Sequence, residues 1–519
     1  MVGGIAPGEL LLEPMSDDID TTVCEHIPFI DNKNPSAPFQ TLDAVWEAVR
    51  RLNGEEVLDA TKLLEPLLTD GQWLLGRSYQ SEVQALVAIG YICKDDFHHA
   101  IALARHAADH REAARFHSIL LTILRFGYWR TRNFEALYGL SRPRFSRASH
   151  ISALSQIFNL SIEAAAEAEQ LRFKLAERLA KDAVELSHQL MGPESNPSLL
   201  PICVLANLAY ESDAIDEADL LLRGRMATID HFLALDGALL GVSVTTKVAL
   251  ARGNVSLALL MLRKGEEIGI RRMWPRLVSY CASEEIAIHI RENRMDMALN
   301  ALAKTEAWVE SLSDHWAQRS IEASPLDVAR YRIALELGQF DLAVQGFRRL
   351  RDSMVNRNHP LLMVKLTVLL AGSLFRAGQE ETAKDELLGA LQLGAGAGLF
   401  RTFVDEMPLI DCCLREIRLS LTAGAAHLNP YVRGLLSAVG SPAVDRKKSN
   451  LNHALADVLS ARETIILRLI SLGMSNKIIA RELHIAPETV KSHAKRIFIK
   501  LSTKTRAEAV ARANEFGLI

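Results

Sequence analysis

The chain has 519 residues, of which 49% are hydrophobic and only 6% aromatic, and its formal net charge is −4. This hydrophobic content is ample for a buried core, and the length predicts more than one domain or one long repeat array. No run of about 18 apolar residues occurs, which excludes a typical membrane-spanning helix and favours a cytoplasmic protein without a membrane partner. The abundance of Ala and Leu favours helices over sheets.

Charge is distributed unevenly along the chain. Residues 459–519 contain 11 Lys or Arg and 5 Asp or Glu, a surplus of +6, which leaves −10 for the rest of the chain. A basic tail on an acidic body indicates a nucleic-acid-binding module attached to a body with a different role.

Residues 1–40 mix Gly, Pro, Asp and Asn and are predicted to form an irregular lead. From residue 41 to residue 440 the sequence predicts one helix after another, separated by short breaks. A half-motif recurs there: a break, then a hydrophobic residue, then an Ala three positions on, then an apolar residue four beyond the Ala. Its clearest copy comprises Gly338, Phe340, Ala343 and Phe347.

The copies of this half-motif are spaced almost regularly. The successive steps are 40, 37, 39, 42, 40, 40, 45 and 40 residues once a degenerate copy at Phe134 and Leu137 fills the one double gap. Such a period predicts stacked helical pairs, and a generic all-helical body with a coincidental Ala spacing is the alternative. The Ala positions are Ala60, Ala100, Ala176, Ala218, Ala258, Ala298, Ala343 and Ala383.

The small Ala side chain lets two antiparallel helices approach closely, while the residues three before and four after it lie on the same helix face. Each pair then buries one stripe within itself and another against the next pair. Such units stack into a superhelix with a concave groove. We expect a small-molecule inducer or a protein partner to bind in that groove.

A group of large side chains at the start of one predicted helix could receive an anionic ligand or an acidic partner, because guanidinium and indole groups bind both. The alternative is that these side chains pack and cap the repeat ends. The group is Arg271, Arg272, Trp274 and Arg276.

The sequence contains no convincing catalytic or metal site, and no cofactor is expected. His106 and His110 are spaced i, i+4 but lack a third ligand nearby. Asp405 and Glu406 are adjacent on a predicted helix, so their side chains should point in different directions. The six cysteines show no zinc spacing; three of them sit in apolar runs and are predicted core residues, and the adjacent Cys412 and Cys413 leave packing or a redox role open.

Residues 441–457 begin with Ser441 and Pro442, which break the helical pattern, and continue with a basic and polar run. They are predicted to be a short linker. Residues 458–519 then predict a compact helical domain. Ser460 and Glu463 form a capping box for its first helix, Gly473 ends that helix, and Ser475 caps the second. Pro487 suits the first position of the third helix, where its missing N–H costs nothing.

The third helix, about residues 487–501, has one apolar and one polar face. Val490, Ala494 and Ile497 repeat at helical spacing and are predicted to be buried together with Leu501. The polar face could enter the major groove of duplex DNA, which admits one helix. The residues expected to contact bases or phosphates are Lys477, Thr489, Lys491, Ser492, Lys495, Arg496, Lys500 and Lys504, with Arg506 as a further phosphate contact.

This segment resembles the LuxR-type helix-turn-helix of bacterial transcription regulators. The resemblance implies that Thr489, Lys491, Ser492 and Lys495 contact DNA. It also implies that the final helix pairs in a homodimer on DNA, through Ala509, Val510 and Ala513. Ile478 and Ala486 depart from the family pattern. The matching residues are Arg462, Glu463, Gly473, Ser475, Asn476, Ile479, Ala480, Leu483, Ile485, Thr489, Val490, Lys491, His493, Ile497, Lys500, Leu501, Arg506 and Ala509.

The segments 398–409 and 430–439, together with the 40-residue period, resemble the repeat body of MalT-like regulators, which has tetratricopeptide-like repeats. Those regulators also carry a nucleotide-binding ATPase, but this sequence has no G-x-x-x-x-G-K-[ST] motif. We therefore predict an all-α protein: a tetratricopeptide-like superhelix followed by a small helix-turn-helix domain. We expect a transcription regulator and not an enzyme, controlled by ligand or partner binding to the repeat body. The alternative is a protein-interaction scaffold with an accessory DNA-binding tail.

Overall fold

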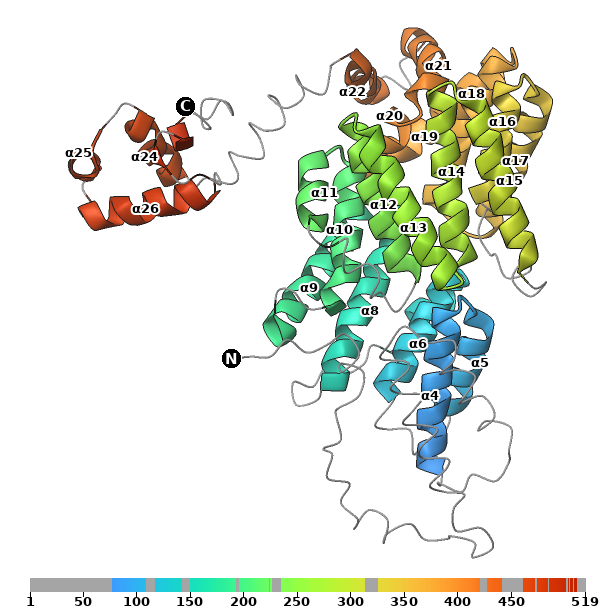
Figure 1. Ribbon diagram of the computed structural model, residues 1–519, viewed down its shortest axis with the longest axis horizontal. Coiled ribbons are helices and arrows are strands. Elements are labelled where there is room, and N and C mark those ends of the chain that lie inside the picture. The colour runs from blue at the N-terminus through green and yellow to red at the C-terminus, as the bar shows by residue number, and fades with distance from the viewer. Residues whose placement is uncertain are drawn as a thin grey trace, which may run out of the picture. The chain divides into compact units, whose positions relative to one another are not determined.

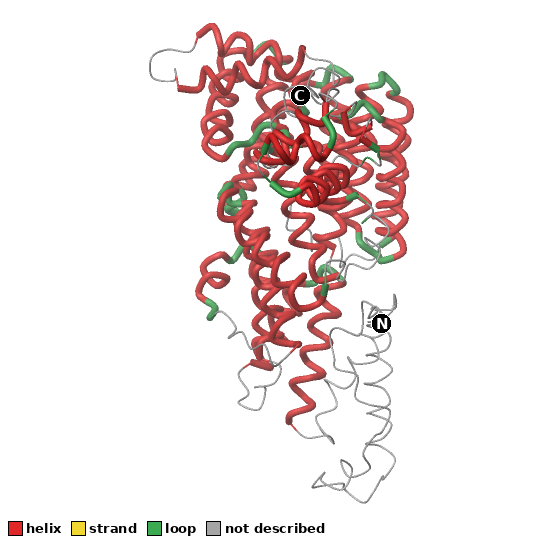
Figure 2. Tube along the Cα trace, turned by 90° about the vertical axis from the view of Figure 1, so that its left-hand side faces the viewer, coloured by secondary structure: helices red, strands yellow, loops and turns green. Residues whose placement is uncertain are grey.

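The computed structural model describes residues 77–108, 117–141, 150–192, 196–223, 225, 235–312, 325–420, 427–440, 461–471, 474–483, 485–500, 503, 505–506 and 508–510. Every regular element in these residues is a helix, as Figure 2 shows, and the predicted all-α class is confirmed. The chain divides into a body, residues 1–435, and a C-terminal unit, residues 436–519. The predicted lead 1–40, the repeat copy at Ala60 and the linker 441–457 lie outside the described residues.

The described body consists of helical pairs, each with a first or A helix and a second or B helix that pack side by side (Figure 1). The pairs are α4 (Arg77–Cys93) with α5 (Phe97–Ala108), α6 (His117–Arg130) with α7 (Phe134–Gly139), α8 (His150–Glu169) with α9 (Phe173–Met191), α10 (Leu199–Glu211) with α11 (Ile215–Leu222), α12 (Leu235–Ala251) with α13 (Val255–Arg271), α14 (Pro275–Arg291) with α15 (Met295–Ser311), α16 (Pro325–Glu336) with α17 (Phe340–Asn356), and α18 (Pro360–Arg376) with α19 (Glu380–Ala397). A short 3₁₀ turn, η2 (Asn196–Ser198), precedes α10, and α20 (Arg401–Val404), α21 (Met407–Ser420) and α22 (Asn429–Gly440) follow the last pair.

One turn geometry joins the A helix to the B helix in these pairs. The residue two positions before the B helix has a left-handed backbone, as at Gly338 with φ 75°. The next backbone N–H returns to the carbonyl five residues earlier; in this copy Gln339 donates to Ala334 at 2.8 Å. This is the Schellman ending of a helix, which satisfies carbonyls that the helix leaves open. The residues with positive φ at this position are Asp95, Arg132, Leu171, Asp213, Gly253, Asn293, Gly338 and Gly378.

The predicted half-motif marks the B helices. Each B helix from α5 to α19 begins at the position of the motif's hydrophobic residue. The motif's Ala is fully buried in every described copy, and Leu137 is buried in the degenerate copy. This burial is what a close approach of the two helices at the Ala requires. The buried Ala residues are Ala100, Ala176, Ala218, Ala258, Ala298, Ala343 and Ala383.

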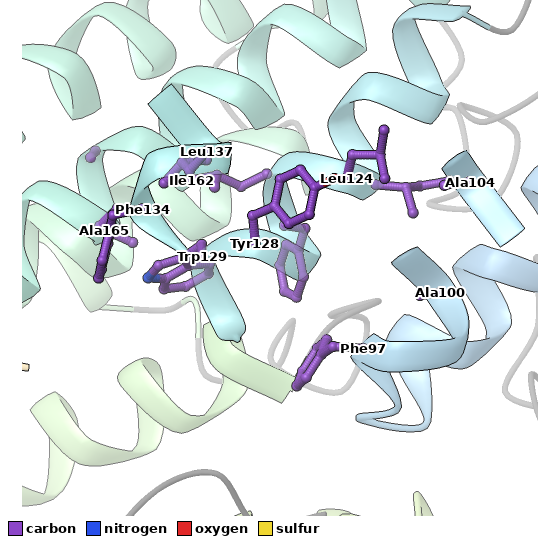
Figure 3. Close-up of a cluster of buried hydrophobic side chains, with 14 of the residues drawn as sticks. Phe97, Ala100, Ala104, Leu124, Tyr128, Trp129, Phe134, Leu137, Ile162 and Ala165 are labelled. Atoms are coloured by element: carbon purple, nitrogen blue, oxygen red, sulfur yellow. The ribbon is translucent and has the colours of Figure 1, made fainter. Parts of the chain in front are cut away.

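Larger side chains fill the space between neighbouring pairs. In the first three described pairs, Phe97, Trp129 and Phe134 converge on one apolar core with Ile162 of α8 (Figure 3). The rings of Phe126 and Trp129 meet edge to face, with centroids 5.4 Å apart. Each pair thus depends on its neighbour to bury its second apolar stripe, as in other stacked repeats.

The body also makes contacts between repeats that are far apart in sequence. The Trp274 indole N–H donates to the Cys93 carbonyl at 2.7 Å, and Gln170 donates to the Asn358 carbonyl at 2.8 Å. In addition, the backbone N–H of Phe400 donates to the Glu211 carbonyl at 2.7 Å. These bonds join residues 181, 188 and 189 positions apart, so the stack winds back on itself after between four and five repeats.

Three predictions about apolar and cysteine residues can be compared with the structure. Among the helices that are described, none combines the length and apolar character needed to cross a membrane. Cys93, Cys203 and Cys281 are buried, which confirms their assignment to the core. Cys412 is exposed, whereas burial raises the pKa of Cys413 to about 12, which disfavours a reactive thiolate there.

Two helix-interior glycines offer a test of the close approach between helices. A Cβ at Gly346 of α17 would lie 2.4 Å from the Tyr331 ring, whereas a Cβ at Gly389 of α19 would meet nothing within 4 Å. We expect Gly346→Ala to destabilise the body by roughly 1–3 kcal/mol through overpacking. We expect Gly389→Ala to stabilise it by about 0.5–1 kcal/mol through the higher helix propensity of Ala. Thermal unfolding by circular dichroism measures both, and equal shifts of the two variants would contradict the close approach.

Candidate nucleic-acid interface and internal cavity

Among its described residues, the C-terminal unit contains the helices α24 (Ala461–Ser471), α25 (Asn476–Glu482) and α26 (Pro487–Lys500). They share a small apolar core in which the predicted stripes of all three helices meet. The predicted inner residues of α26, Val490, Ala494 and Ile497, are buried, which confirms the orientation of that helix. The other buried members are Ile466, Leu467, Ile470, Ile479, Ala480 and Ala509.

Ser475 lies at the N-cap position of α25, as expected, with extended backbone (ψ 156°). Its side chain makes no capping hydrogen bond, so the prediction holds for the position and fails for the bond. Its carbonyl accepts from the backbone N–H groups of Ile478 and Ile479, each at 2.9 Å. Ser460 and Gly473 lie outside the described residues, and the side chain of Glu463 is not described, so the predicted capping box and helix end stay predictions.

Arg506 has a different role from the one that the sequence suggested. We expected it to neutralise a phosphate, but its guanidinium donates to the Met474 carbonyl and to Asn476 Oδ1, the latter at 3.1 Å. These bonds tie the segment after α26 to the beginning of α25. Arg506 therefore holds the domain together, and its guanidinium is already occupied within the chain.

A tight turn joins α25 to α26. The Ile485 N–H donates to the Ala480 carbonyl at 3.0 Å, and Pro487 is the first residue of α26, as predicted. Pro at this position is preorganised for a helix and loses no hydrogen bond. The turn fixes α26 across α25, which is the arrangement of a helix-turn-helix.

The outer face of α26 is polar and positively charged. Its predicted contact residues whose side chains are described are all exposed. Lys491 Nζ lies 3.6 Å from a Glu488 carboxylate oxygen, with side chains 71% and 84% exposed. Such an exposed pair contributes little and releases the lysine readily. The exposed residues on this face are Thr489, Lys491, Ser492, Lys495 and Arg496.

The remaining predicted residues lie in different environments. Lys477 on α25 is exposed, and Lys500 ends α26 with a side chain that is not described. Ala509 is fully buried in the domain's own core, so its side chain packs inside the domain rather than on a surface. Val510 is half-buried, and a role in dimerisation stays a prediction for it. Lys504 and Ala513 lie outside the described residues.

The group around Trp274 is engaged in contacts within the body. Trp274 is buried at the N-cap of α14, and the Arg272 guanidinium lies 5.3 Å from its ring centroid. Arg276 forms ion pairs with Asp95 at 2.7 Å and with Asp236 at 2.9 Å. These contacts favour the alternative that the group packs and joins repeat ends, and they leave no exposed indole for a ligand. Arg271 is exposed at the end of α13.

The body contains a partly open cavity of about 520 Å³, lined by side chains from the A helices α6 to α18 and from the segment 401–408. This is the concave side that the repeat pattern predicted. The lining holds seven Lys or Arg side chains and six carboxylates. The sequence analysis considered Arg276, Asp405 and Glu406 but missed the rest of this lining, because the repeated half-motif lies in the B helices, whereas the cavity is formed by the inner faces of the A helices.

A buried cluster closes one side of this cavity. Glu211 accepts from Lys365 Nζ at 2.8 Å and from the Thr402 hydroxyl at 2.7 Å. Burial alone would raise the pKa of Glu211, but Lys365 and its other donors lower it from 4.5 to about 2. Next to it, the Arg401 guanidinium pairs with Asp405 at 2.6 Å. The cluster joins α10 and α18 to the segment that begins at Phe400.

The adjacent carboxylates of Asp405 and Glu406 point to different partners, as the sequence predicted. Asp405 pairs with Arg401 and accepts from the Tyr210 hydroxyl at 2.9 Å. Glu406 instead pairs with Arg332 of α16. They hold two separate helices to the segment after α19 and do not form a paired-carboxylate site.

The fold and the site define a helical-repeat protein with a C-terminal helix-turn-helix domain. Two known families match the chain: residues 81–418 match the MalT-like TPR region, and residues 457–513 match the bacterial regulatory proteins of the luxR family. Because the first match spans more than half of the sequence, the chain belongs to the family with a MalT-like TPR region. Both predicted resemblances are confirmed, and the family of the C-terminal domain is one of regulatory proteins and not of enzymes.

Curated relatives match parts of the chain. The HTH-type transcriptional regulator AlkS of Pseudomonas putida is 26% identical over 178 residues, which is 34% of this chain and 19% of AlkS. MalT of Vibrio campbellii is 27% identical over 233 residues, 42% of this chain and 25% of MalT. The transcriptional regulatory protein NarL of Mycobacterium tuberculosis is 51% identical over 59 residues, 11% of this chain and 27% of NarL. The matches thus span about a fifth to a quarter of these relatives' lengths.

The contacts of Arg506 predict a structural role for this residue. Arg506→Met should loosen the C-terminal unit because the Met474 carbonyl and the Asn476 side chain lose their donor. Hydrogen–deuterium exchange of the full chain should show faster exchange in residues 474–483, while the body exchanges as in the wild type. Arg496→Met, an exposed change on α26, is the matched control. Unchanged exchange in Arg506→Met would mean that its guanidinium does not stabilise the domain.

The Glu211 cluster predicts a pH-dependent effect. Lys365→Met leaves a buried carboxylate without its ion pair and should cost about 3 kcal/mol at pH 7. Because the pKa of Glu211 is lowered in the folded chain, its contribution is present above pH 4.5 and is lost as the pH falls toward 2. The stability deficit of Lys365→Met should therefore shrink as the pH falls from 4.5 toward 2 in thermal unfolding. Glu211→Gln in the same chain should restore part of the loss, and a deficit independent of pH would contradict the assignment.

Proposed function

We propose that this protein is a bacterial transcription regulator that binds duplex DNA through α26 and whose repeat body controls that binding. The observation that carries the proposal is the two-sided character of α26. Val490, Ala494 and Ile497 anchor one face, while five polar and cationic side chains stay exposed on the other. The similarity to luxR-family regulatory proteins supports the same reading.

On DNA, α26 would lie in the major groove, whose width admits one helix. Lys491 and Lys495 are one helical turn apart on the exposed face and would reach guanine edges or phosphates. Thr489 and Ser492 would hydrogen-bond base edges beside them. Lys477 on α25 would contact the sugar-phosphate backbone together with Lys500 and Lys504, so binding should weaken steeply with salt.

Regulators with a single reading helix commonly bind as symmetric dimers, with half-sites about 10–10.5 base pairs apart. We propose the same for this chain, with Val510 and Ala513 at the dimer contact. Ala509 is not included in this contact, because its side chain is buried in the domain core.

The body is proposed to act as the sensor of a small molecule. A cavity of about 520 Å³ with paired and unpaired charges supports a small ligand better than the alternative of a scaffold for a protein partner, because this volume is in the range of small-molecule sites. The relatives named AlkS and MalT are both transcriptional regulators, which supports the same general role.

The reading face predicts the outcome of one double substitution. In the full chain, Lys491→Ala with Lys495→Ala should lower affinity for a duplex enriched from a random pool at least about 100-fold, because each lost cationic contact is worth about 1–3 kcal/mol. Where these contacts are to phosphates, the slope of log affinity against log salt should fall by about 0.9 for each one. Gel shifts at several salt concentrations measure both quantities.

The matched control is Lys174→Ala with Lys264→Ala, two exposed lysines on B helices of the body. This control should bind the enriched duplex as the wild type does. A footprint that is unchanged in the Lys491 and Lys495 variant would refute α26 as the reading helix.

A further inference from the structure

Residues that line the cavity recur at equal sequence spacing on consecutive A helices, and we call this series the cavity ladder. Tyr210 on α10, Lys247 on α12 and Glu284 on α14 lie 37 residues apart in sequence, and all three line the cavity. One turn earlier, Ser243 and Tyr280 occupy the same two helices, α12 and α14, at the same 37-residue spacing. Equal spacing on parallel, adjacent helices places Lys247 and Glu284 beside one another on the inner surface.

The earlier rung is closed by a hydrogen bond. The Tyr280 hydroxyl donates to Ser243 Oγ at 2.6 Å. This bond fixes the separation of α12 and α14 at the level just before Lys247 and Glu284. Lys247 and Glu284, one turn later on the same two helices, therefore line the cavity from helices whose separation is fixed by this bond.

Lys247 and Glu284 differ from the charged groups around them. Glu211 pairs with Lys365, Asp405 with Arg401, and Glu406 with Arg332. Lys247 and Glu284 are both described in full, yet neither has an ion pair within 4 Å or a hydrogen bond to a described side chain, and they do not pair with each other. The one ring contact of Lys247 is with Tyr210, whose centroid lies 6.0 Å from Nζ.

The electrostatics around Lys247 favour its charged form. Burial alone lowers the pKa of Lys247, but the neighbouring carboxylates, Glu284 foremost, raise it. Lys247 therefore stays an ammonium at neutral pH. An ammonium and a carboxylate that face one cavity without direct partners are costly to desolvate unless a group of opposite charge meets each of them.

From this geometry we propose that the cavity binds a small zwitterion of the amino-acid or short-peptide class, with its carboxylate on Lys247 and its ammonium on Glu284. The inference rests on the proposed role of the body as a sensor and names the class of ligand. A zwitterion adds no net charge to a lining of seven cationic and six anionic side chains, whereas a multiply charged anion would upset that balance. The cavity volume of about 520 Å³ accommodates an amino acid or a dipeptide with an apolar side chain.

The apolar part of such a ligand also has a place. Leu239 and Leu250 of α12 and Leu366 of α18 line the same cavity. Tyr210 stands beside Lys247, where its ring can cover a bound apolar side chain. Apolar walls with a few fixed polar groups are the usual composition of a small-ligand site.

The test uses the full chain without DNA. The twenty amino acids and a set of their dipeptides are screened by thermal shift, and hits are titrated by calorimetry. For L-leucine as an example, the matched probes are 4-methylpentanoate, which keeps only the carboxylate, and 3-methylbutylamine, which keeps only the ammonium. We expect at least one zwitterion to bind and its two single-charge analogues to bind at least about tenfold more weakly.

Variants then test the two contacts. Lys247→Met and Glu284→Gln should each weaken binding of the hit at least about tenfold. Lys264→Met and Glu267→Gln, two exposed changes on the outer helix α13, should bind it as the wild type does. Circular dichroism verifies that each variant is folded, and because Glu284→Gln keeps the shape of the side chain, it tests the charge even if Lys247→Met unfolds.

Three outcomes would overturn the proposal: no zwitterion binds, the single-charge analogues bind equally well, or both cavity variants retain full affinity. A sugar or another neutral polyol that binds in place of zwitterions would overturn it as well. These outcomes leave the proposed DNA binding standing, since Lys491 and Lys495 are tested separately. Conversely, a zwitterion that requires Lys247 and Glu284 supports the site even if the chain fails to bind DNA.

Discussion

The left-handed turn between the two helices of a pair is the constraint on which the body depends. It reverses the chain within three residues and brings the fully buried motif Ala against the partner helix. The left-handed residue is Gly in three of the described turns and Asp, Asn, Arg or Leu in the other five. A non-Gly residue there costs about 1 kcal/mol in strain, so the Schellman hydrogen bonds and the packing of each pair must exceed that cost. The B helix consequently starts at the same motif position in every pair.

This constraint explains which parts of the structure the sequence could predict. The motif and the turn are local, and Gly338 with Phe340, Ala343 and Phe347 reports one helix boundary and one contact within ten residues of chain. The helix-turn-helix is local too, since Val490, Ala494 and Ile497 share one helix face and Pro487 marks its beginning. Patterns of this length depend on propensity and on 3.6-residue periodicity, which are properties of short segments.

The parts that could not be predicted are those that depend on how distant repeats meet. For Trp274 the sequence left a ligand site and packing open, because its partner, the Cys93 carbonyl, is 181 residues away. Arg506 read as a phosphate contact, since nothing near it in sequence shows that the Met474 carbonyl needs a donor. The cavity ladder of Tyr210, Lys247 and Glu284 is periodic, but its residue types differ from repeat to repeat. A search for the same residue type in every repeat misses this ladder, whereas a search for polar residues at the repeat spacing on A helices would find it.

The same long-range contacts suggest how occupancy of the cavity could be sensed within the body. Glu211, Asp405 and Glu406 all face Lys247, and each also holds the segment that follows α19 to a helix of the wall. A ligand carboxylate on Lys247 would reduce the field that this ammonium exerts on those three carboxylates, and would so weaken one attraction that holds them in place. In a closely packed interior such a change is taken up by movement of a whole element rather than by small local shifts. The element that these contacts hold is the four-residue α20, which leads directly into α21 and the end of the body. A charge placed in the centre of the stack would thereby act on the last helices of the body.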